Sequence, residues 1–586
     1  MGNLLPGRLN TESGKDYETC FFREVSDLVQ KEVGTLEERS KSLKETIAVF
    51  QEQYAEGDYE VAPLIDNAAN SYRDTVGELK AIVKKAQKPY FGRIIFDNDS
   101  VYIGRTGIRR DQADVLVADW RAPISNAYYE NGLGNVSFKT PVGDDVNINL
   151  TLKRTFDISD GKLIDYYDSE AATDDELLNK YLAKNKQAVL NEIIATIQKE
   201  QNDIIRMSPK HNLIVQGVAG SGKTTVAMHR ISYLLYNYGD YLKPESFYVI
   251  GSNKMLLKYI TGVLPDLGVD GFGQMTMEEL FTRLMYTDWD HFRYAIRETD
   301  NSDPAAALKG KEEYFEALKA FLDKYERNVI KTEDVMLYPD QFTEGFENGV
   351  AGIYDRRDNP TGRKSGPVCL LRGSAIKKYI DDNPQFSVQT KTDFLNNEIK
   401  ENLENELSYK GMSYTEKERK AIRSAYRCPI GEKEFKGSIY KIYDDFISTL
   451  ENADKLKPTY RYEEREVTWK AGKKAGSKGQ EALKEDDAGS GEARSTEEIK
   501  PPVKTARVKI TEYDVYDLAA LAYIHHRVNE THVISEANHI VIDEAQDYGM
   551  MAYLVLKECV HDCKYTIMGD VSQNIRYTSG LNDWTA

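Results

Sequence analysis

The chain has 586 residues and a formal net charge of −18 at neutral pH. At about 150 residues per domain, this length suggests roughly four domains or large inserts. Hydrophobic residues make up 41% of the chain and charged residues 29%, which excludes a wholly disordered protein. The acidic balance argues against a surface that is basic throughout and binds nucleic acid non-specifically, although it is compatible with a local basic groove.

Cysteine usage and hydropathy indicate the compartment. The five cysteines are too few and too scattered for a disulfide scaffold, which favours a reducing cytoplasm. No stretch approaches the roughly 20 apolar residues of a membrane span, and the first ten residues do not resemble a secretory signal. We therefore expect a cytoplasmic protein that has no membrane partner.

Residues 1–89 are predicted to form a helical hairpin arm, with its helices in 17–89. Apolar residues repeat every seven positions in the first helix, at Val29, Leu36, Leu43 and Phe50. The seam of the second helix is predicted at Ile65, Ala69, Tyr72, Val76, Leu79, Val83 and Ala86. An antiparallel coiled-coil arm of thirty-odd residues extends roughly 50 Å.

The expected turn of this arm is acidic. Between Lys44 and Arg73 there is no basic residue. The six acids of this stretch are Glu45, Glu52, Glu56, Asp58, Glu60 and Asp66. One interpretation is a solvated acidic turn, and the other is a probe that enters a positively charged or metal-bearing pocket.

The rest of the chain divides by its pattern. Residues 90–176 predict a β-rich platform with hairpin turns at 97–99 and 160–161. Residues 177–284 begin with a helical pattern to Arg206 and continue as strand 212–216, helix 223–238 and strand 246–251. This βαβ order predicts a parallel sheet, which 511–586 completes after a mainly helical insert at 285–510. The segment near 470–507 is predicted to be mobile because it holds few large apolar residues.

The strongest motif is the run GVAGSGKT at residues 217–224, which matches GxxxxGK[ST] between a strand and a helix. The loop predicts a cradle for the phosphates of ATP, formed by Gly217, Gly220, Ser221, Gly222, Lys223, Thr224 and Thr225. Lys223 is expected to reach the β- and γ-phosphates, and Thr224 to bind Mg²⁺.

Two further strand ends carry polar residues. Strand 539–542 is followed by Asp543, which can hold Mg²⁺, and by Glu544, which can polarise the attacking water. Strand 565–569 leads to Gln573, which is placed to sense a γ-phosphate. The predicted catalytic set is therefore Lys223, Glu544 and Gln573.

Together, the segments VQGVAGSGKTT, VIDEAQD and GDVSQ resemble superfamily 1 helicases of the UvrD/Rep type. The resemblance implies a RecA-like P-loop NTPase core within an α/β fold. It also implies that Gln201 contacts adenine and that Asn253 and Thr276 face single-stranded nucleic acid. Met275 departs from the family, which often has a small polar residue there.

The arm, the strands YFGRIIF and YIGR and the segment VADWRAP give a narrower resemblance, to the HelD family. That family implies RNA polymerase core enzyme as the partner. The arm would enter the secondary channel, with Glu56, Asp58 and Glu60 at its tip, and the insert would occupy the main channel.

A superfamily 1 motor needs a second RecA-like domain, and nothing after Asp570 is long enough to supply one. We expect a fragment, a truncated product or a separately encoded second half. Because that domain supplies arginines that stabilise the transferring phosphoryl group, weak hydrolysis by this chain alone is expected.

Three functions stay open from the sequence. The first is an ATP-driven factor that releases RNA polymerase from DNA and recycles it. The second is a DNA helicase or translocase acting in repair, which binds single strands with steep salt dependence. The third is a chain that docks through its arm without productive turnover.

Overall fold

The computed structural model describes residues 14–585 except 98, 112–113, 131, 142, 169–196, 270, 286–287, 343–366, 409–413, 428, 431–438, 469–502 and 530–536. The chain forms two compact units, and each combines segments that are distant in sequence. Unit 1 comprises Met1–Met275, Ala537–Ala545 and Asp562–Asp570. Unit 2 comprises Thr276–Glu536, Gln546–His561 and Val571–Ala586.

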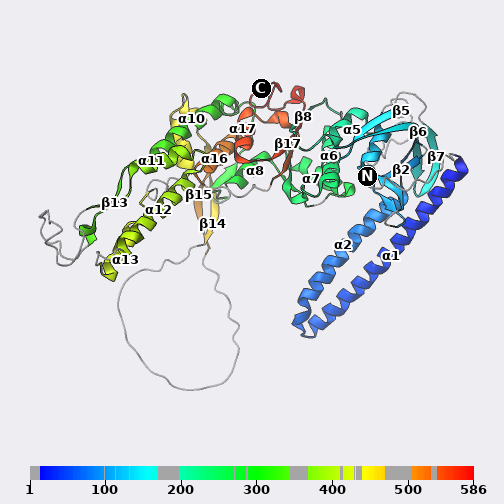
Figure 1. Cartoon of the computed structure of the whole chain (residues 1–586), viewed down its shortest axis with the longest axis horizontal. Coiled ribbons are helices and arrows are strands. Elements are labelled where there is room, and N and C mark those ends of the chain that lie inside the picture. The colour runs from blue at the N-terminus through cyan, green and yellow to red at the C-terminus, as the bar shows by residue number, and fades with distance from the viewer. Residues whose placement is uncertain are drawn as a thin grey trace, which may run out of the picture. The chain divides into compact units, whose positions relative to one another are not determined.

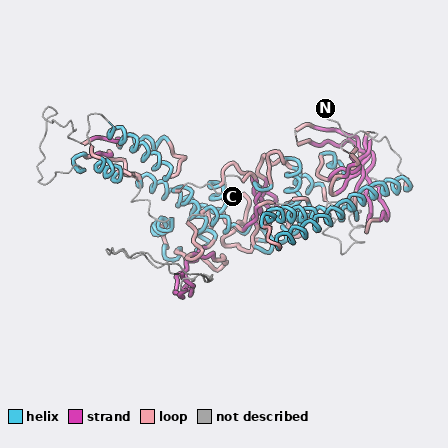
Figure 2. Tube along the Cα trace, turned by 90° about the horizontal axis from the view of Figure 1, so that it is seen from below, coloured by secondary structure: helices cyan, strands magenta, loops and turns pink. Residues whose placement is uncertain are grey.

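Unit 1 begins with two long helices, α1 (Lys15–Ala55) and α2 (Ala62–Gln87), which lie side by side (Figure 1 and Figure 2). At about 1.5 Å per residue, the 41 residues of α1 extend about 60 Å. The chain reverses through Gly57, whose φ of 104° favours glycine, and the short helix η1 (Tyr59–Val61). The predicted helical hairpin is therefore present.

The predicted seam of α2 is right on one track and shifted by one residue on the other. Ile65, Tyr72, Leu79 and Ala86 are half-buried, as predicted, whereas the second track runs one residue before the predicted Ala69, Val76 and Val83. The buried residues of α2 are Ala68, Thr75 and Ile82, whereas Val83 is 39% exposed. The sequence pattern placed only apolar residues in the seam. Thr75 can be buried because its hydroxyl donates a hydrogen bond to the carbonyl of Ser71 one turn earlier, at 2.8 Å.

The platform is a seven-stranded sheet with the order β3-β4-β2-β1-β6-β5, and β7 also pairs with β6. Its strands are β1 (Gly92–Phe96), β2 (Asp99–Gly104), β3 (Ile108–Arg109), β4 (Val115–Asp119), β5 (Gly134–Lys139), β6 (Asp145–Ser159) and β7 (Lys162–Asp168). Both predicted hairpins are confirmed by the antiparallel pairs β1–β2 and β6–β7. Between β6 and β7, Asp160 and Gly161 both have positive φ, as a two-residue hairpin turn requires.

A buried carboxylate fixes the arm to the platform. Glu18 of α1 is fully buried and accepts hydrogen bonds from Arg93 and Arg154, each at 2.7 Å. Its second oxygen accepts from the hydroxyl of Tyr102 at 2.7 Å. Phe21 stacks on the Tyr102 ring with centroids 3.8 Å apart. Because each buried charge has partners, the base of the arm is held in one orientation.

The second sheet of unit 1 has five strands in the order β10-β9-β16-β17-β8, and all neighbours are parallel. These strands are β8 (Leu213–Gln216), β9 (Phe247–Ile250), β10 (Gly273–Met275), β16 (His539–Ile542) and β17 (Lys564–Gly569). Helix α5 (Lys199–Arg206) precedes β8, α6 (Lys223–Tyr238) connects β8 to β9, and α7 (Lys254–Val263) lies between β9 and β10. The predicted parallel α/β arrangement is present, while residues 177–196 of the predicted helix lie outside the described residues.

The segment Asp119-Trp120-Arg121 joins the platform to this sheet. Arg121 pairs with Asp119 at 2.7 Å and donates to the hydroxyl of Ser232 on α6 at 3.1 Å. Arg206 at the end of α5 donates to the carbonyl of Trp120 at 2.6 Å. This segment is thus a polar junction between the two sheets.

Unit 2 is richer in helices. They include α8 (Met277–Leu284), α9 (Pro304–Lys309), α10 (Glu312–Val329), α11 (Gly373–Asp382), α12 (Val388–Ser408), α13 (Glu416–Ala425), α14 (Ile439–Ser448), α15 (Ala453–Leu456), α16 (Val515–Val528) and α17 (Met550–Cys559). Helix α16 forms the centre of this unit, since residues Val515–His525 are all buried.

Unit 2 also contains strands that the sequence pattern did not predict. They are β11 (Tyr294–Ile296), β12 (Val335–Leu337), β13 (Val368–Leu371), β14 (Thr459–Thr468) and β15 (Val503–Tyr513). Strands β14 and β15 pair along their length as an antiparallel ribbon. The predicted mobile segment therefore extended too far, because its last residues, 503–507, belong to β15. Its other residues from 470 to 502 lie outside the described part of the chain.

Candidate functional site

The glycine loop connects β8 to α6. Gly220 and Gly222 have φ of 79° and 85°, the left-handed region that favours glycine. A Cβ on Gly217 would lie 2.6 Å from the Ser221 hydroxyl oxygen, so a side chain here would displace that hydroxyl. The loop leads directly into the N-terminus of the 16-residue helix α6. Backbone N–H groups at such a helix start attract phosphate.

Lys223 folds back over this loop. Its Nζ donates to the carbonyl of Gly217 at 2.7 Å and approaches that of Val218 at 3.4 Å. The side chain is half-buried. The ammonium therefore lies against the loop backbone, where it can exchange a carbonyl partner for a phosphate oxygen.

Thr224 and Asp543 meet although 319 residues separate them in sequence. The Thr224 hydroxyl donates to Oδ2 of Asp543 at 2.6 Å. Asp543 follows β16, and its backbone N–H donates to the carbonyl of Ile250 at the end of β9. Both side chains thus lie at the carboxyl edge of the parallel sheet, where ligand sites of such sheets occur.

Burial controls the ionisation of Asp543. The carboxyl is 1% exposed, and this desolvation raises its pKa above the ordinary value. The neighbouring charge of Glu544 acts in the same direction, while the hydrogen bond from Thr224 opposes the shift. A carboxylate and a hydroxyl oxygen in contact are a donor set that suits Mg²⁺, so the residues fit that cation.

Glu544 has an unusual backbone. Its φ is 51°, a left-handed conformation that costs a non-glycine residue on the order of 1–3 kcal/mol. The residue is half-buried and directly follows Asp543. Strained backbone of this kind concentrates at functional sites, and the catalytic role of Glu544 stays a prediction.

Gln201 lies directly against the glycine loop. Its Nε2 donates to the carbonyl of Ser221 at 2.9 Å, and its Oε1 accepts from the backbone N–H of Gln198 at 3.2 Å. The second bond belongs to a capping box that starts α5. The side chain predicted to contact adenine is therefore fixed at the border of the loop.

One pair at this site was missed by the sequence analysis. Gln216 donates to Oδ1 of Asp570 at 2.9 Å, and Asp570 is 1% exposed. Beside them, the N–H of Gly217 donates to the carbonyl of Gly569 at 3.3 Å. The signal was the position of Asp570 after a strand, but its partner follows only from β8 lying next to β17.

The residues predicted to face nucleic acid are not brought to the loop by any described contact. Asn253 is exposed, with its amide 3.4 Å from the Ser252 hydroxyl. Thr276 is 8% exposed, and its hydroxyl caps α8 by accepting from the N–H of Glu279 at 3.3 Å. Thr276 and Gln573 belong to unit 2, whereas the loop belongs to unit 1. Their predicted roles remain predictions.

The predicted partner residues of the arm lie at its tip. Glu56, Asp58 and Glu60 are all exposed. Asp58 accepts a hydrogen bond from the N–H of Glu60 at 3.2 Å and so starts η1. Two exposed aromatic rings, Tyr54 and Tyr59, contact each other beside these acids with centroids 5.2 Å apart.

Comparison with protein families gives one match. Residues 18–180 match the model described as DNA helicase IV HelD, N-terminal domain. The matched region includes almost all of the arm and the platform, and it supports a HelD-type protein. No curated protein matches the chain. Within the described residues, every helix is either too short or too polar to cross a lipid bilayer.

Proposed function

We propose that this chain is an ATP-binding and ATP-hydrolysing motor protein of the UvrD-like type that binds RNA polymerase. In this proposal it promotes release of the polymerase from nucleic acid and its recycling. The observation that carries the ATPase part is the 2.6 Å contact between Thr224 and Asp543 beside the glycine loop. It joins a hydroxyl at the start of α6 to a carboxylate at the end of β16.

Each residue of the site has a task in this proposal. The backbone N–H groups of the loop bind the phosphates, and Lys223 neutralises their charge. Thr224 and Asp543 would hold Mg²⁺, which when bound neutralises charge on the phosphate oxygens. Glu544 orients and polarises the attacking water by accepting its hydrogen bond. Gln201 positions the adenine.

RNA polymerase core enzyme is the partner that we propose for the arm. The family match over residues 18–180 supports a HelD-type protein, and the resemblance of the sequence to the HelD family implies this partner. The charge of the arm supports it independently, because the exposed acids Glu56, Asp58 and Glu60 lie at its tip, and the part of α1 beyond Leu36 extends about 30 Å. A concentrated negative charge on such a projection suits a positively charged or metal-bearing pocket.

The proposal is tested by capture of purified bacterial RNA polymerase core enzyme in the absence of DNA. Deleting the whole arm would expose the platform, since Glu18 and Phe21 are buried in it. Leu36 and Leu79 both pack against the cluster at the arm base. Replacing residues 37–78 with a short Gly-Ser loop therefore removes the tip and keeps the base. We expect the intact chain to capture the polymerase and the shortened chain to fail.

The alternative function is a DNA helicase or translocase of the UvrD/Rep type that acts in repair. The same loop residues support it, and the name of the matched family model includes a DNA helicase. This alternative predicts tight single-strand binding that weakens steeply with salt. Failure to capture polymerase, together with such salt-sensitive binding, would favour the alternative.

A further inference from the structure

The β14–β15 ribbon of unit 2 presents one solvent-facing side with a distinct composition. Its register places Tyr462 opposite Lys509 and Glu464 opposite Arg507. Because side chains alternate across a strand, Tyr460, Tyr462, Arg507 and Lys509 share one side, which we call the ribbon face. All four are exposed, and the tyrosines are 56% and 52% exposed. Aromatic side chains left in water on adjacent positions indicate an interaction surface.

Each tyrosine of the ribbon face carries a cation. The Lys509 Nζ lies 4.1 Å from the centre of the Tyr460 ring, and the Arg507 guanidinium carbon lies 4.5 Å from that of Tyr462. The two ring centroids are 5.9 Å apart, with their planes at 84°. The ribbon face therefore offers two exposed aromatic rings, each with a positive charge over one of its faces.

Acidic residues of the ribbon are mostly neutralised on its other side. Glu463 pairs with Arg461 at 2.7 Å and with Arg465 at 2.8 Å. Glu512 also pairs with Arg461. Among the side chains of the ribbon face that the structure describes, Glu464 is the one acid, and Arg507 and Lys509 are the two cations. The described side chains of the face therefore carry two positive charges and one negative charge, with Glu464 opposite Arg507.

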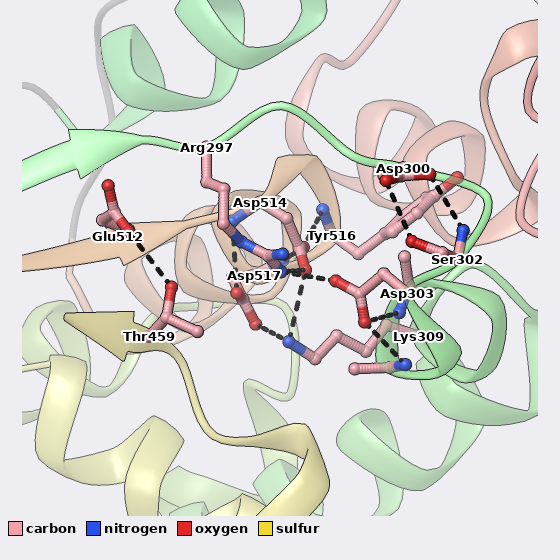
Figure 3. Close-up of polar contacts among 12 residues, drawn as sticks. Arg297, Asp300, Ser302, Asp303, Lys309, Thr459, Glu512, Asp514, Tyr516 and Asp517 are labelled. Carbon is pink, nitrogen blue, oxygen red and sulfur yellow. Dashed lines mark hydrogen bonds and ion pairs between the residues drawn. The ribbon is translucent and has the colours of Figure 1, made fainter.

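A buried ionic cluster anchors the base of the ribbon (Figure 3). Strand β15 leads into Asp514, which is fully buried and accepts from Arg297 at 3.1 Å and Lys309 at 3.4 Å. Lys309 also pairs with Asp517 at 2.5 Å. Between the strands, the hydroxyl of Thr459 donates to Glu512 at 3.3 Å. The ribbon face is thus presented on a fixed base and not on a loose loop.

We propose that the ribbon face binds single-stranded nucleic acid, with bases stacked on Tyr460 and Tyr462 and phosphates bound by Arg507 and Lys509. Successive bases of a duplex strand are stacked 3.4 Å apart and parallel. The rings are farther apart and nearly perpendicular, so only an unstacked strand can use both. An acidic protein would satisfy the two cations but leave the rings without flat partners.

This inference extends the proposed function by naming a surface for the nucleic acid. The ribbon belongs to unit 2 and the glycine loop to unit 1. Binding by the ribbon face therefore does not depend on ATP hydrolysis. A Lys223→Ala variant is expected to keep nucleic-acid binding, so that the two proposals can fail separately.

The test is fluorescence anisotropy of the full chain, without nucleotide, against a labelled 20-nucleotide oligo(dT) and a 20-base-pair duplex. We expect tighter binding to the single strand. Tyr460→Ala with Tyr462→Ala should weaken it at least about tenfold because both stacking surfaces are lost. Arg507→Ala with Lys509→Ala should also reduce the salt dependence, since two phosphate contacts disappear.

Two controls separate stacking from misfolding. Tyr460→Phe with Tyr462→Phe retains both rings and is expected to bind like the wild type. Tyr338→Ala removes a ring that is 46% exposed elsewhere in unit 2 and should have no effect. The proposal is overturned if the double alanine variant binds as well as the wild type, or if the wild-type chain does not bind the oligonucleotide. Binding of an acidic protein in place of the oligonucleotide would assign the face to a protein partner.

Discussion

Lys223 makes the most direct residue-scale prediction. Its ammonium contacts only backbone carbonyls of the loop among the hydrogen bonds described, and the side chain is half-buried. Lys223→Ala should therefore fold normally and lower ATP hydrolysis by about 10²–10³-fold, as expected when one preorganised charge contact is lost. Phosphate release and binding of a fluorescent ATP analogue measure the two effects.

Lys243→Ala is the matched control for this prediction. Like Lys223, Lys243 donates to a backbone carbonyl, that of Gly239 at the end of α6, at 2.9 Å. Lys243 lies outside the loop. The Lys243→Ala variant should hydrolyse ATP at the same rate as the wild-type chain. If Lys223→Ala retained full hydrolysis, the loop would have to be assigned another task.

The sequence could predict the site residues that depend on local geometry or on a general property of parallel sheets. The spacing of Gly217, Gly222 and Lys223 determines the loop. Thr224 and Asp543 meet because the carboxyl ends of parallel strands share one edge. The bond between Gln216 and Asp570 could not be predicted in the same way. It depends on which strands are neighbours, and strand order is a property of the whole sheet.

At the scale of elements, the register of α2 gives a prediction from two adjacent residues. Ile82 is 7% exposed and packs in the cluster at the arm base, whereas Val83 is 39% exposed. Ile82→Ala should destabilise the arm base by about 2–5 kcal/mol because it removes buried methyl groups and leaves a cavity. Val83→Ala should change stability by no more than about 0.5 kcal/mol.

Hydrogen exchange of the backbone amides in α1 and α2 measures this difference, since it reports local opening without requiring the two units to unfold together. If Ile82→Ala and Val83→Ala changed hydrogen exchange equally, Val83 would belong to the seam, as predicted from the sequence. One track of the predicted register was displaced by a residue because apolarity alone was used to select its positions, while a threonine that bonds its own helix can also be buried.

Two buried histidines make the parallel sheet of unit 1 sensitive to acid. Burial lowers the pKa of His539 to about 3 and that of His229 to about 4. His539 contacts the Thr566 hydroxyl at 2.9 Å, and His229 contacts the Thr225 carbonyl at 2.7 Å. In the unfolded chain these two histidines bind a proton as the pH falls through about 6.5, whereas in the folded chain they stay neutral at that pH. Their stabilising contribution is present above pH 6.5 and is lost as the pH falls toward 4 and 3.

Between pH 7.5 and pH 5.5, each histidine should therefore cost about 1.4 kcal/mol of stability. Hydrogen exchange of β16 and β17 at the two pH values measures the loss. In His539→Gln the loss should be smaller by about that amount, because this side chain does not titrate. His211→Gln, at an exposed position, serves as the control and should behave like the wild type. An unchanged pH dependence in His539→Gln would contradict the assignment.

At the scale of the whole molecule, each compact unit is assembled from separate segments of the chain. The sequence could predict elements inside these units where the pattern was strong, such as α6, α16 and the arm. It did not predict the β14–β15 ribbon, although Tyr460, Tyr462, Lys509 and Thr511 alternate as a strand requires. One side of the ribbon faces solvent and carries charges, so its apolar content is too low for a hydrophobic pattern to reveal it.

The acidic tip makes the prediction that links the arm to the proposed partner. Glu56→Gln, Asp58→Asn and Glu60→Gln together remove three negative charges. They keep side-chain size and a side-chain oxygen at position 58 to start η1. This variant should lower the rate at which stalled RNA polymerase is released from its template by at least about tenfold, because electrostatic attraction to a basic channel is lost. ATP binding should be unchanged, since the loop is formed by other elements of the chain.

The matched control removes the same charge from the shaft of the arm. Glu37, Glu38 and Glu78 are exposed, and their replacement by glutamine changes the net charge of −18 by the same three units. If net charge alone mattered, both variants would release RNA polymerase equally slowly. If the tip enters a basic pocket, only the tip variant would release it slowly. Equal release by both variants, measured by gel shift of the template, would reduce the tip to a solvated acidic turn. Selective loss would show that the position of the acids on the arm, and not their number, determines their function.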